Sequence, residues 1–225
     1  MKKISVAIDG PSGAGKSTVA RAVAAKYKFI YVDTGAIYRT VGLAAQLAGV
    51  DSKDKEGVIA LLPGINIEMS YDESGVQRML LDGKDVSGEI RTPRSSIYAS
   101  DVSAYPEVRS FLMDMQRNMA EKYPVIMDGR DIGTVVLPNA EVKIFLTATP
   151  EARAQRRYKE LIAKGVKDSF EDVLKDIQYR DAQDSSRAAA PLKAADDAVI
   201  LDNTELSFEE SVEAACAIIE EKAGI

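Results

Sequence analysis

The first residues whose types and spacing suggest chemistry are GPSGAGKS, at positions 10–17, directly after an apolar run at 4–8. Glycines let the backbone adopt angles closed to other residues and approach a ligand closely. Successive backbone N–H groups can then point inward and bind anionic oxygens, and a helix beginning near Lys16 adds the positive end of its dipole. The spacing fits G-x-x-x-x-G-K-[ST], the P-loop, and predicts a site for nucleotide phosphates.

Two side chains of this loop have expected tasks. Lys16 bridges the outer phosphates as a mobile charge, and the Ser17 hydroxyl is placed for Mg²⁺. The alternative is a chance glycine-rich turn, but the position between an apolar strand and a helix favours the nucleotide site. The loop alone does not decide the fate of the outermost phosphate, because hydrolysis needs a positioned water and transfer needs a second substrate.

Arginines follow two further apolar runs. DTGAIYR, at 33–39, carries Arg39, and its Thr34 is the expected N-cap of the next helix. MDGRDIG, at 127–133, places Arg130 directly after a strand. An ordinary charged surface loop is the alternative for both segments. Their position at strand ends favours a functional role, because binding residues concentrate on loops held by a rigid scaffold.

A third arginine-rich segment spans residues 151–187. Like charges on one exposed helix face repel each other by a few tenths of a kcal/mol, roughly. A multiply charged ligand between two helices therefore explains the cluster better than a solvated helical hairpin balanced by acidic residues. We expect a closing lid that shields a transferred phosphoryl group from water, while Arg39, Arg130 and Arg187 hold an anionic acceptor. The clustered residues are Arg153, Arg156 and Arg157, then Arg180, Asp184 and Arg187.

The composition excludes several kinds of site. The chain has no histidine and a single cysteine, Cys216, so Ser-His and Cys-His mechanisms, an internal disulfide and a thiolate zinc site are ruled out. Cys216 shares a helical face with apolar residues, which predicts a small core residue. The net charge of −6 argues against binding a nucleic-acid polymer, which needs a basic surface.

The elements that must position these residues alternate along the chain. Apolar runs predict strands at 4–8, 29–32, 124–127, 142–147 and 198–201. Helical patterns fall at 16–27, 36–48, 106–122, 150–164, 170–181 and 207–222. This alternation predicts an α/β fold, a P-loop three-layer sandwich around a five-stranded parallel sheet whose strand ends share one ligand-binding edge.

One region breaks this alternation. Residues 65–70 alternate apolar and polar side chains, and DESG then supplies a turn before a second run, which predicts an antiparallel hairpin inserted at about 63–90. We divide the single unit, 1–225, into a core, an acceptor-binding region and a lid. The core takes 1–32, 105–150 and 190–225, the acceptor-binding region takes 33–104, and the lid takes 151–189.

The motifs together resemble a known family. GPSGAGKST, DTGAIYR, DVSGEIRT, DGRDIGTVV, VKIFLTA and RDAQDSSRAAAPL occur in the order found in bacterial cytidylate kinases, which are nucleoside monophosphate kinases, and the match covers nearly the whole chain. The resemblance implies a kinase that transfers the γ-phosphate of ATP to CMP or dCMP, with Mg²⁺, in pyrimidine nucleotide metabolism. It also implies a small antiparallel sheet in the acceptor region and an arginine-bearing lid.

The resemblance also implies site residues. Those that bind the ATP phosphates are Gly10, Pro11, Ser12, Gly13, Ala14, Gly15, Lys16, Ser17 and Thr18. Those that bind the acceptor are Thr34, Arg39, Ser100, Arg109, Arg130, Asp131, Arg180, Asp184 and Arg187. Arg153 and Arg157 match the lid, and the catalytic set is Lys16, Arg130, Arg153, Arg157 and Arg187. The metal side is Ser17 with Asp128, which ends an apolar strand.

Ser100, Arg109 and Asp131 match the positions that read cytosine in this family. Cytosine presents an N4 amino donor, which a carboxylate such as Asp131 can accept, whereas uracil presents a carbonyl there. UMP is therefore expected to be the poorer acceptor by roughly ten- to a hundredfold. The alternatives are a kinase for another small acceptor, a nucleotide-dependent switch and a non-catalytic binding module. No N-K-x-D motif supports a switch GTPase, and the intact Lys16 and Ser17 argue against a non-catalytic module.

We expect a cytoplasmic monomer that binds no membrane. No run approaches 18 consecutive apolar residues, and the N-terminal apolar run is too short for a signal peptide. The fold does not require an oligomer.

Overall fold

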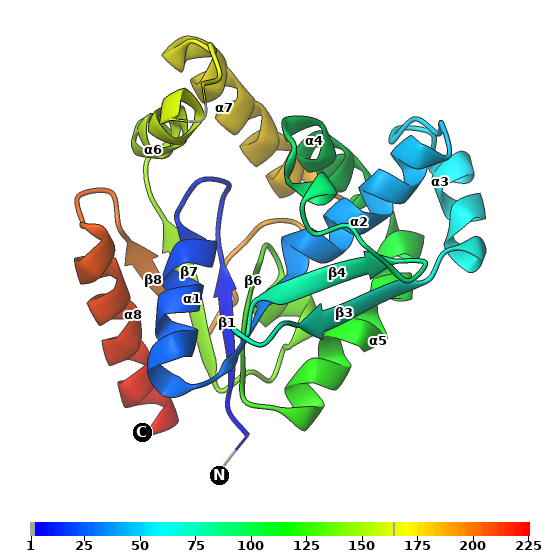
Figure 1. Cartoon of the computed structure of the whole chain (residues 1–225). Coiled ribbons are helices and arrows are strands. Elements are labelled where there is room, and N and C mark those ends of the chain that lie inside the picture. The colour runs from blue at the N-terminus through cyan, green and yellow to red at the C-terminus, as the bar shows by residue number, and fades with distance from the viewer. Residues whose placement is uncertain (1–2, 164) are drawn as a thin grey trace.

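The computed structural model describes residues 3–163 and 165–225 (Figure 1). Its centre is a five-stranded sheet in the order β2-β6-β1-β7-β8, and every neighbouring pair is parallel. The five predicted strands and their parallel arrangement are confirmed. Their bounds are β1 Ser5–Asp9, β2 Ile30–Asp33, β6 Val125–Gly129, β7 Val142–Thr147 and β8 Val199–Asp202.

Helices cover both faces of this sheet, which confirms the three-layer sandwich (Figure 1). Successive side chains of a strand point to opposite faces. In β1, Val6 and Ile8 therefore pack with α1 (Lys16–Tyr27) and α8 (Phe208–Ala223), whereas Ala7 joins the core formed with α2 (Thr34–Leu47) and α5 (Pro106–Lys122). Cys216 is buried in the first of these two cores, as its position on the apolar face of the last helix predicts.

The predicted insertion is an antiparallel sheet with one strand more than the sequence indicated. Strands β3 (Ile67–Tyr71) and β4 (Gln77–Leu81) form the predicted hairpin, and the short β5 (Lys84–Asp85) pairs with β4. Met79 and Leu81 are buried in the same core as α2. The inserted sheet therefore packs on the helix that carries Arg39.

The segment predicted to be a lid contains α6 (Pro150–Ala163) and α7 (Phe170–Ser186), which share a small core of their own. Helix α7 is longer than the predicted 170–181, so it carries both Arg180 and Asp184, and Arg187 follows as its C-cap residue. Residue 164, the predicted end of α6, and residues 1 and 2 of the predicted core lie outside the described residues.

The sequence did not indicate several short helices. Helix α4 (Pro93–Val102) packs against α2, and Gly42 permits the contact, because a Cβ there would lie 2.9 Å from the Tyr98 Cβ. The others are α3 (Lys55–Leu61) and the short turns η1 (Leu62–Gly64), η2 (Glu89–Arg91) and η3 (Ile132–Val136). Across the described chain, no helix has the length and apolar character that spanning a membrane requires.

Candidate active site

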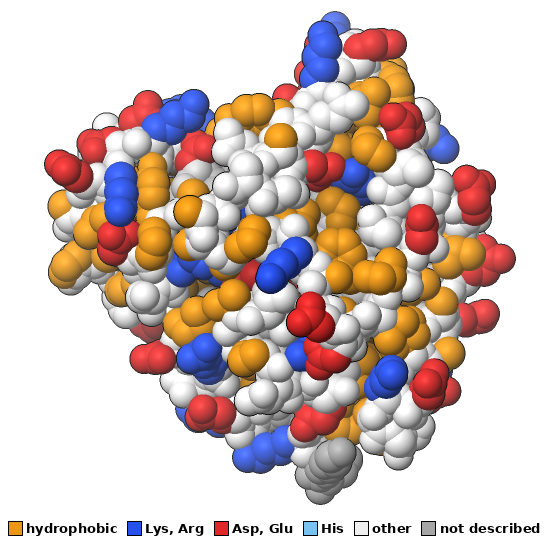
Figure 2. Space-filling view, turned by 180° about the vertical axis from the view of Figure 1, so that it is seen from behind, with side chains coloured by type: hydrophobic (Ala, Val, Ile, Leu, Met, Phe, Trp, Pro, Cys, Tyr) orange, Lys and Arg blue, Asp and Glu red, His pale blue; other side chains and the backbone are white. Residues whose placement is uncertain are grey.

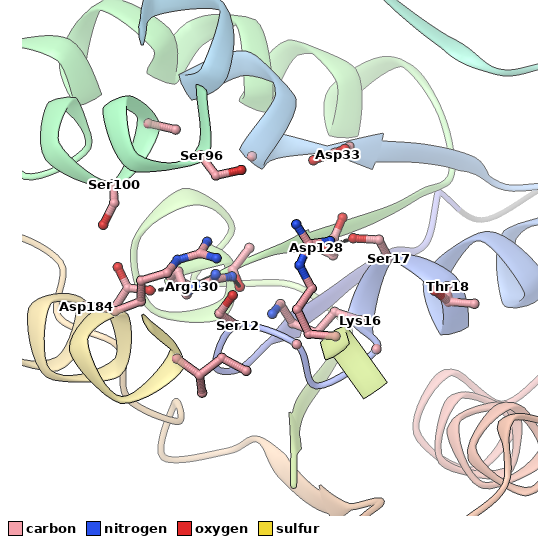
Figure 3. Close-up of a pocket in the computed structure, with 18 of the residues that line it drawn as sticks. Ser12, Lys16, Ser17, Thr18, Asp33, Ser96, Ser100, Asp128, Arg130 and Asp184 are labelled. Atoms are coloured by element: carbon pink, nitrogen blue, oxygen red, sulfur yellow. Dashed lines mark hydrogen bonds and ion pairs between the residues drawn. The ribbon is translucent and has the colours of Figure 1, made fainter. Parts of the chain in front are cut away.

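A cavity of about 890 Å³ opens at the carboxyl ends of the parallel strands, between the lid helices and the acceptor-binding region. Figure 3 shows Lys16 and Arg130 within it, with Asp184 approaching from α7. This is the edge at which parallel α/β folds bind ligands. The predicted residues that line it are Ser12, Gly13, Gly15, Lys16, Ser17, Thr18, Thr34, Arg39, Ser100, Arg109, Asp128, Arg130, Asp131, Arg157, Arg180, Asp184 and Arg187.

The cavity lining carries many charges of both signs. Of the described residues, nine arginines and Lys16 line it, together with eight aspartates and glutamates. Figure 2 shows both signs of charge interspersed over the rear face of the molecule as well. The lining thus has a small excess of cations in a protein with a net charge of −6, which suits an anionic ligand.

The P-loop runs from β1 into α1 and holds Lys16 inside the protein. The Lys16 ammonium donates to the Pro11 carbonyl at 2.7 Å and is almost fully buried. Burial, together with the nearby charge of Arg130, lowers the pKa of Lys16 to about 7. Gly10 has a φ of +148°, and a Cβ there would lie 1.9 Å from the Leu146 carbonyl oxygen, so only glycine fits.

Ser17 and Asp128 meet at the base of the loop. The Ser17 hydroxyl donates to one Asp128 carboxylate oxygen at 2.8 Å, and the Tyr31 hydroxyl donates to the other at 2.7 Å. Burial, and then the neighbouring Asp33, raise the pKa of Asp128. Hydroxyl and carboxylate oxygens are ligands that Mg²⁺ accepts. Within the described ranges, no three His, Cys, Asp or Glu side chains cluster as a dedicated metal site.

The acceptor side holds arginines with unused donors. The Arg130 Nε donates to Asp184 at 2.7 Å, and an Arg187 Nη donates to the Ser103 hydroxyl at 2.9 Å. Within residues 3–163 and 165–225, the Arg39 Nε, Arg180 Nε and Arg187 Nη2 are buried and have no hydrogen-bond partner. Buried polar groups are normally bonded, so these donors could serve an anionic ligand.

Electrostatics at this end are dominated by guanidinium groups. Burial, together with the charge of Arg130, lowers the pKa of Arg180 to about 10. Burial alone would raise the pKa of Asp184, but Arg130 and Arg187 outweigh it and hold that pKa below its usual value. A phosphate entering between these arginines would therefore replace water with charge-assisted hydrogen bonds.

Arg109 and Asp131 form a buried ion pair deeper in the cavity. The Arg109 guanidinium lies 5.6 Å from the centre of the Tyr38 ring and also donates to the Ser103 carbonyl at 3.2 Å. Ser100, from α4, lines the same part of the cavity. The pair thus presents a donor and an acceptor side by side, which is the pattern that an amino-carbonyl base edge requires.

The N-cap prediction for Thr34 is wrong. The N-cap of α2 is Asp33, whose carboxylate accepts from the Ala36 N–H at 2.9 Å. Thr34 lies in the first helical turn, and its hydroxyl donates to the Asp128 carbonyl at 2.7 Å. Both residue types cap helices well, so residue type alone did not decide between two adjacent candidates.

Arg153 does not reach the cavity. Its guanidinium is buried against the back of the P-loop, where it donates to the Ala148 and Ser12 carbonyls and pairs with Asp181 of α7 at 2.7 Å. In this conformation it ties the lid to the P-loop, and its catalytic role stays a prediction. Three other predicted ligands within the described chain also lie behind the cavity lining, namely Gly10, Pro11 and Ala14.

Sequence reasoning missed the contribution of Asn203, which follows β8. Its side-chain amide donates to the Ala14 carbonyl at 3.1 Å, and its amide oxygen accepts from Arg156 at 3.0 Å. It therefore links the P-loop to the lid at the cavity wall. A polar residue directly after a parallel strand was the available signal, the same rule that singled out Arg130.

Comparison with known proteins agrees with this geometry. The family model described as cytidylate kinase matches residues 6–221. A cytidylate kinase from Caldicellulosiruptor saccharolyticus is 49% identical over 93% of this chain and 92% of the relative, and one from Bacillus licheniformis is 46% identical over 99% and 98%. The solved structure of an uncharacterized protein from Eubacterium ventriosum, at 11% identity, covers 96% of this chain and 98% of that chain with a TM-score of 0.50, which shows the fold alone. The chain belongs to the cytidylate kinase family.

Proposed function

We propose that this protein transfers the γ-phosphate of ATP to CMP or dCMP, giving ADP and CDP or dCDP. The observation that carries the proposal is that Arg39, Arg180 and Arg187 line one cavity with Lys16, and that each has a buried guanidinium donor without a partner in the described part of the chain. A hydrolase needs one phosphate site and a water. Two opposed sets of cations in one cavity instead fit a donor and an acceptor that are both anionic.

On the donor side, the P-loop backbone and Lys16 hold the ATP phosphates. Ser17 and Asp128 would hold Mg²⁺, and the ion, when bound, neutralises charge on the phosphates. The supporting observation is their oxygen pair at the base of the loop. Tyr31 fixes the Asp128 carboxylate by its hydrogen bond, so the side chain is oriented before any ligand arrives.

On the acceptor side, Arg39, Arg130 and Arg187 hold the nucleotide phosphate in line with the outermost phosphate of ATP. No covalent enzyme intermediate is required, because positioning and charge stabilisation carry phosphoryl transfer. Arg157, which lines the cavity from α6, adds positive charge from the lid. Closure of α6 and α7 over the cavity excludes water and so favours transfer over hydrolysis.

Base selection is assigned to the buried pair of Arg109 and Asp131, with Ser100. The Asp131 carboxylate accepts from the cytosine amino group, while Arg109 and Ser100 face the N3 and O2 acceptors. A uracil carbonyl at the same position faces the carboxylate with no proton between them. We therefore expect CMP and dCMP to be used in preference to UMP by roughly ten- to a hundredfold. The cytoplasmic location and the monomeric state stay predictions from the sequence.

The test is an acceptor panel. Purified protein receives ATP and Mg²⁺ with each nucleoside monophosphate in turn, and with a sugar acid, and ADP formation is followed. We expect rapid ADP formation only with CMP and dCMP. ATP turnover that is independent of any acceptor would indicate a switch or an ATPase, and preferential use of another acceptor would refute the base assignment.

A further inference from the structure

A side chain of the inserted sheet, Gln77, forms hydrogen bonds with Asp33, the last residue of β2. The Gln77 amide oxygen accepts from the Asp33 N–H at 2.7 Å, and the amide nitrogen donates to the Asp33 carbonyl at 3.2 Å. Both groups are buried, and Gln77 itself is only 6% exposed. The side chain thus forms hydrogen bonds with both the backbone N–H and the backbone carbonyl of one residue.

This pairing occurs on the free edge of the central sheet. Strand β2 is the last strand in the sheet order, and its other side pairs with β6. Two residues along the same edge, the Tyr31 carbonyl accepts from the Tyr71 hydroxyl of β3 at 3.0 Å. Alternate residues of a strand share an edge, so Tyr71 and Gln77 both bond to the outward edge of β2.

The two bonds of Gln77 hold the backbone angles of Asp33. The Asp33 N–H belongs to the peptide plane before its Cα, and the carbonyl belongs to the plane after it. Planes fixed on both sides of a Cα fix its φ and ψ, here −80° and 92°, and thereby the direction of the Cβ. Gln77 therefore sets where the Asp33 carboxylate points.

The Asp33 carboxylate in turn holds Arg39. One oxygen caps α2 at the Ala36 N–H, and the other accepts from Arg39 at 2.8 Å. Gly35 leaves room for this pair, because a Cβ there would lie 3.0 Å from an Arg39 Nη. The Arg39 Nε is one of the buried donors without a partner among the described residues, and the side chain lines the cavity.

We propose that Gln77 is a positioning residue for the acceptor phosphate, acting through Asp33 on Arg39. The inserted sheet thereby takes part in acceptor binding without touching the acceptor. This inference rests on the proposed function, since it assumes that Arg39 binds the phosphate of CMP. The alternative is a purely structural role, in which Gln77 only anchors the inserted sheet to β2.

Two substitutions separate these readings. Gln77→Met keeps the length and burial of the side chain but removes both hydrogen bonds. Gln77→Glu keeps the acceptor for the Asp33 N–H and, when ionised, places a negative charge against the Asp33 carbonyl. We expect the Kd for CMP, measured by titration calorimetry, to rise about tenfold in both variants, with the Kd for ATP within about twofold of the wild type.

The matched control is Tyr71→Phe. It removes another hydrogen bond between the inserted sheet and the same edge of β2. That bond is made to Tyr31, whose side chain does not contact Arg39. We expect its CMP affinity to equal that of the wild type. Protonation of the carboxyl introduced by Gln77→Glu restores a donor, so the ratio of variant to wild-type Kd should fall as the pH is lowered from 8 to 5.5.

A double-mutant cycle with Arg39→Lys tests the route. If Gln77 acts through Arg39, Gln77→Met should add little to the CMP loss already caused by Arg39→Lys. Equal loss of CMP and ATP binding, an equal loss in Tyr71→Phe, unchanged CMP affinity or full additivity would each overturn the inference. Failure of the proposed function is seen separately, as a wild-type protein that does not phosphorylate CMP.

Discussion

The ends of the cavity that we propose for the donor and for the acceptor are built in different ways. The donor end is a contiguous loop, residues 10–18, that offers backbone N–H groups and one buried lysine. The acceptor end is assembled from side chains on α2, α4, α5, α7 and the segment after β6. Backbone N–H groups contact phosphates, which all nucleoside triphosphates share, whereas side chains can read one base.

This difference sets the expected pattern of mutant effects. Loss of a phosphate-binding group in the P-loop should lower the rate of transfer to every acceptor equally. Loss of an acceptor side chain should change which acceptor is used and leave ATP binding intact. Substitutions at each end probe that contrast, and the largest effect is expected in the P-loop.

Lys16→Met removes the buried ammonium group of the P-loop and keeps about the same side-chain length. We expect kcat to fall about 10³-fold, because a preorganised charge at the transferred phosphoryl group is lost. Burial lowers the Lys16 pKa to about 7, so keeping this lysine charged costs the folded protein stability at neutral pH, and the thermal midpoint of the variant should not fall below that of the wild type. A stopped assay with saturating CMP and ATP measures kcat, and a variant within tenfold of the wild type would show that Lys16 is not catalytic.

Asp131→Ala should act on the acceptor alone. We expect kcat/KM for CMP to fall about a hundredfold with the KM for ATP unchanged, since the cytosine amino group loses its partner. The alanine variant also leaves the buried Arg109 without its carboxylate, at a cost of about 3–5 kcal/mol of stability. Asp131→Asn keeps the shape of the site and serves as the folding control. Equal losses for CMP and ATP would mean that the base is read elsewhere.

Asp9 joins the two regions. It ends β1 just before the P-loop, and its carboxylate accepts from the Ile132 and Gly133 N–H groups at 2.8 and 2.7 Å, in the segment that follows Arg130 and Asp131. Burial raises its pKa to about 6, although these two bonds lower it. A carboxyl whose pKa is higher in the folded protein than in the unfolded chain stabilises the fold most at low pH, and this contribution is lost as the pH rises through about 6.

Asp9→Asn should remove that pH dependence. Between pH 4.5 and pH 7.5, the free energy of unfolding of the wild type should fall by about 2 kcal/mol relative to the variant. Urea unfolding at the two pH values measures the difference, and the other titrating groups are common to both proteins. If the difference in free energy of unfolding between wild type and variant were the same at both pH values, the assignment of a raised pKa to Asp9 would be contradicted.

Arg157→Gln is expected to have the smallest effect. Its side chain lines the cavity from the lid but remains 38% exposed, so we expect about a tenfold loss of kcat and little change in stability. Lys159→Gln, an exposed cation on the same helix outside the cavity lining, is the matched control and should match the wild type. Equal losses in both variants would show a general charge effect of the lid.

The proposed donor end could be predicted from one local motif, whereas the acceptor residues came from separate segments and mainly from the family resemblance. The P-loop is local, so its residues, the strand before it and the helix after it can be read together. The five strands and the insertion were also predicted, because their hydrophobic periodicity is local. The Thr34 cap and the inward turn of Arg153 depend on tertiary neighbours such as Asp33 and Asp181, which spacing along the chain does not reveal.

The positioning contacts of Gln77 and Asn203 belong to the same class. Each forms hydrogen bonds to backbone groups far away in the sequence, at Asp33 and Ala14. Their residue types are common on surfaces and carry no motif. The position of Asn203 after a strand was a signal in the sequence, but the contact partners of both residues are seen only in the folded arrangement.

The measurement that tests the central claim most directly uses adenosine and cytidine joined 5′ to 5′ through a chain of phosphates. The account places two nucleotides face to face across Lys16, Arg130 and Arg187. This single molecule should therefore fill both ends of the cavity. We expect one molecule bound per chain, at least about a hundredfold more tightly than ADP or CMP, with both nucleotides excluded. A complex from which ATP displaces the compound while CMP still binds beside it would contradict the account.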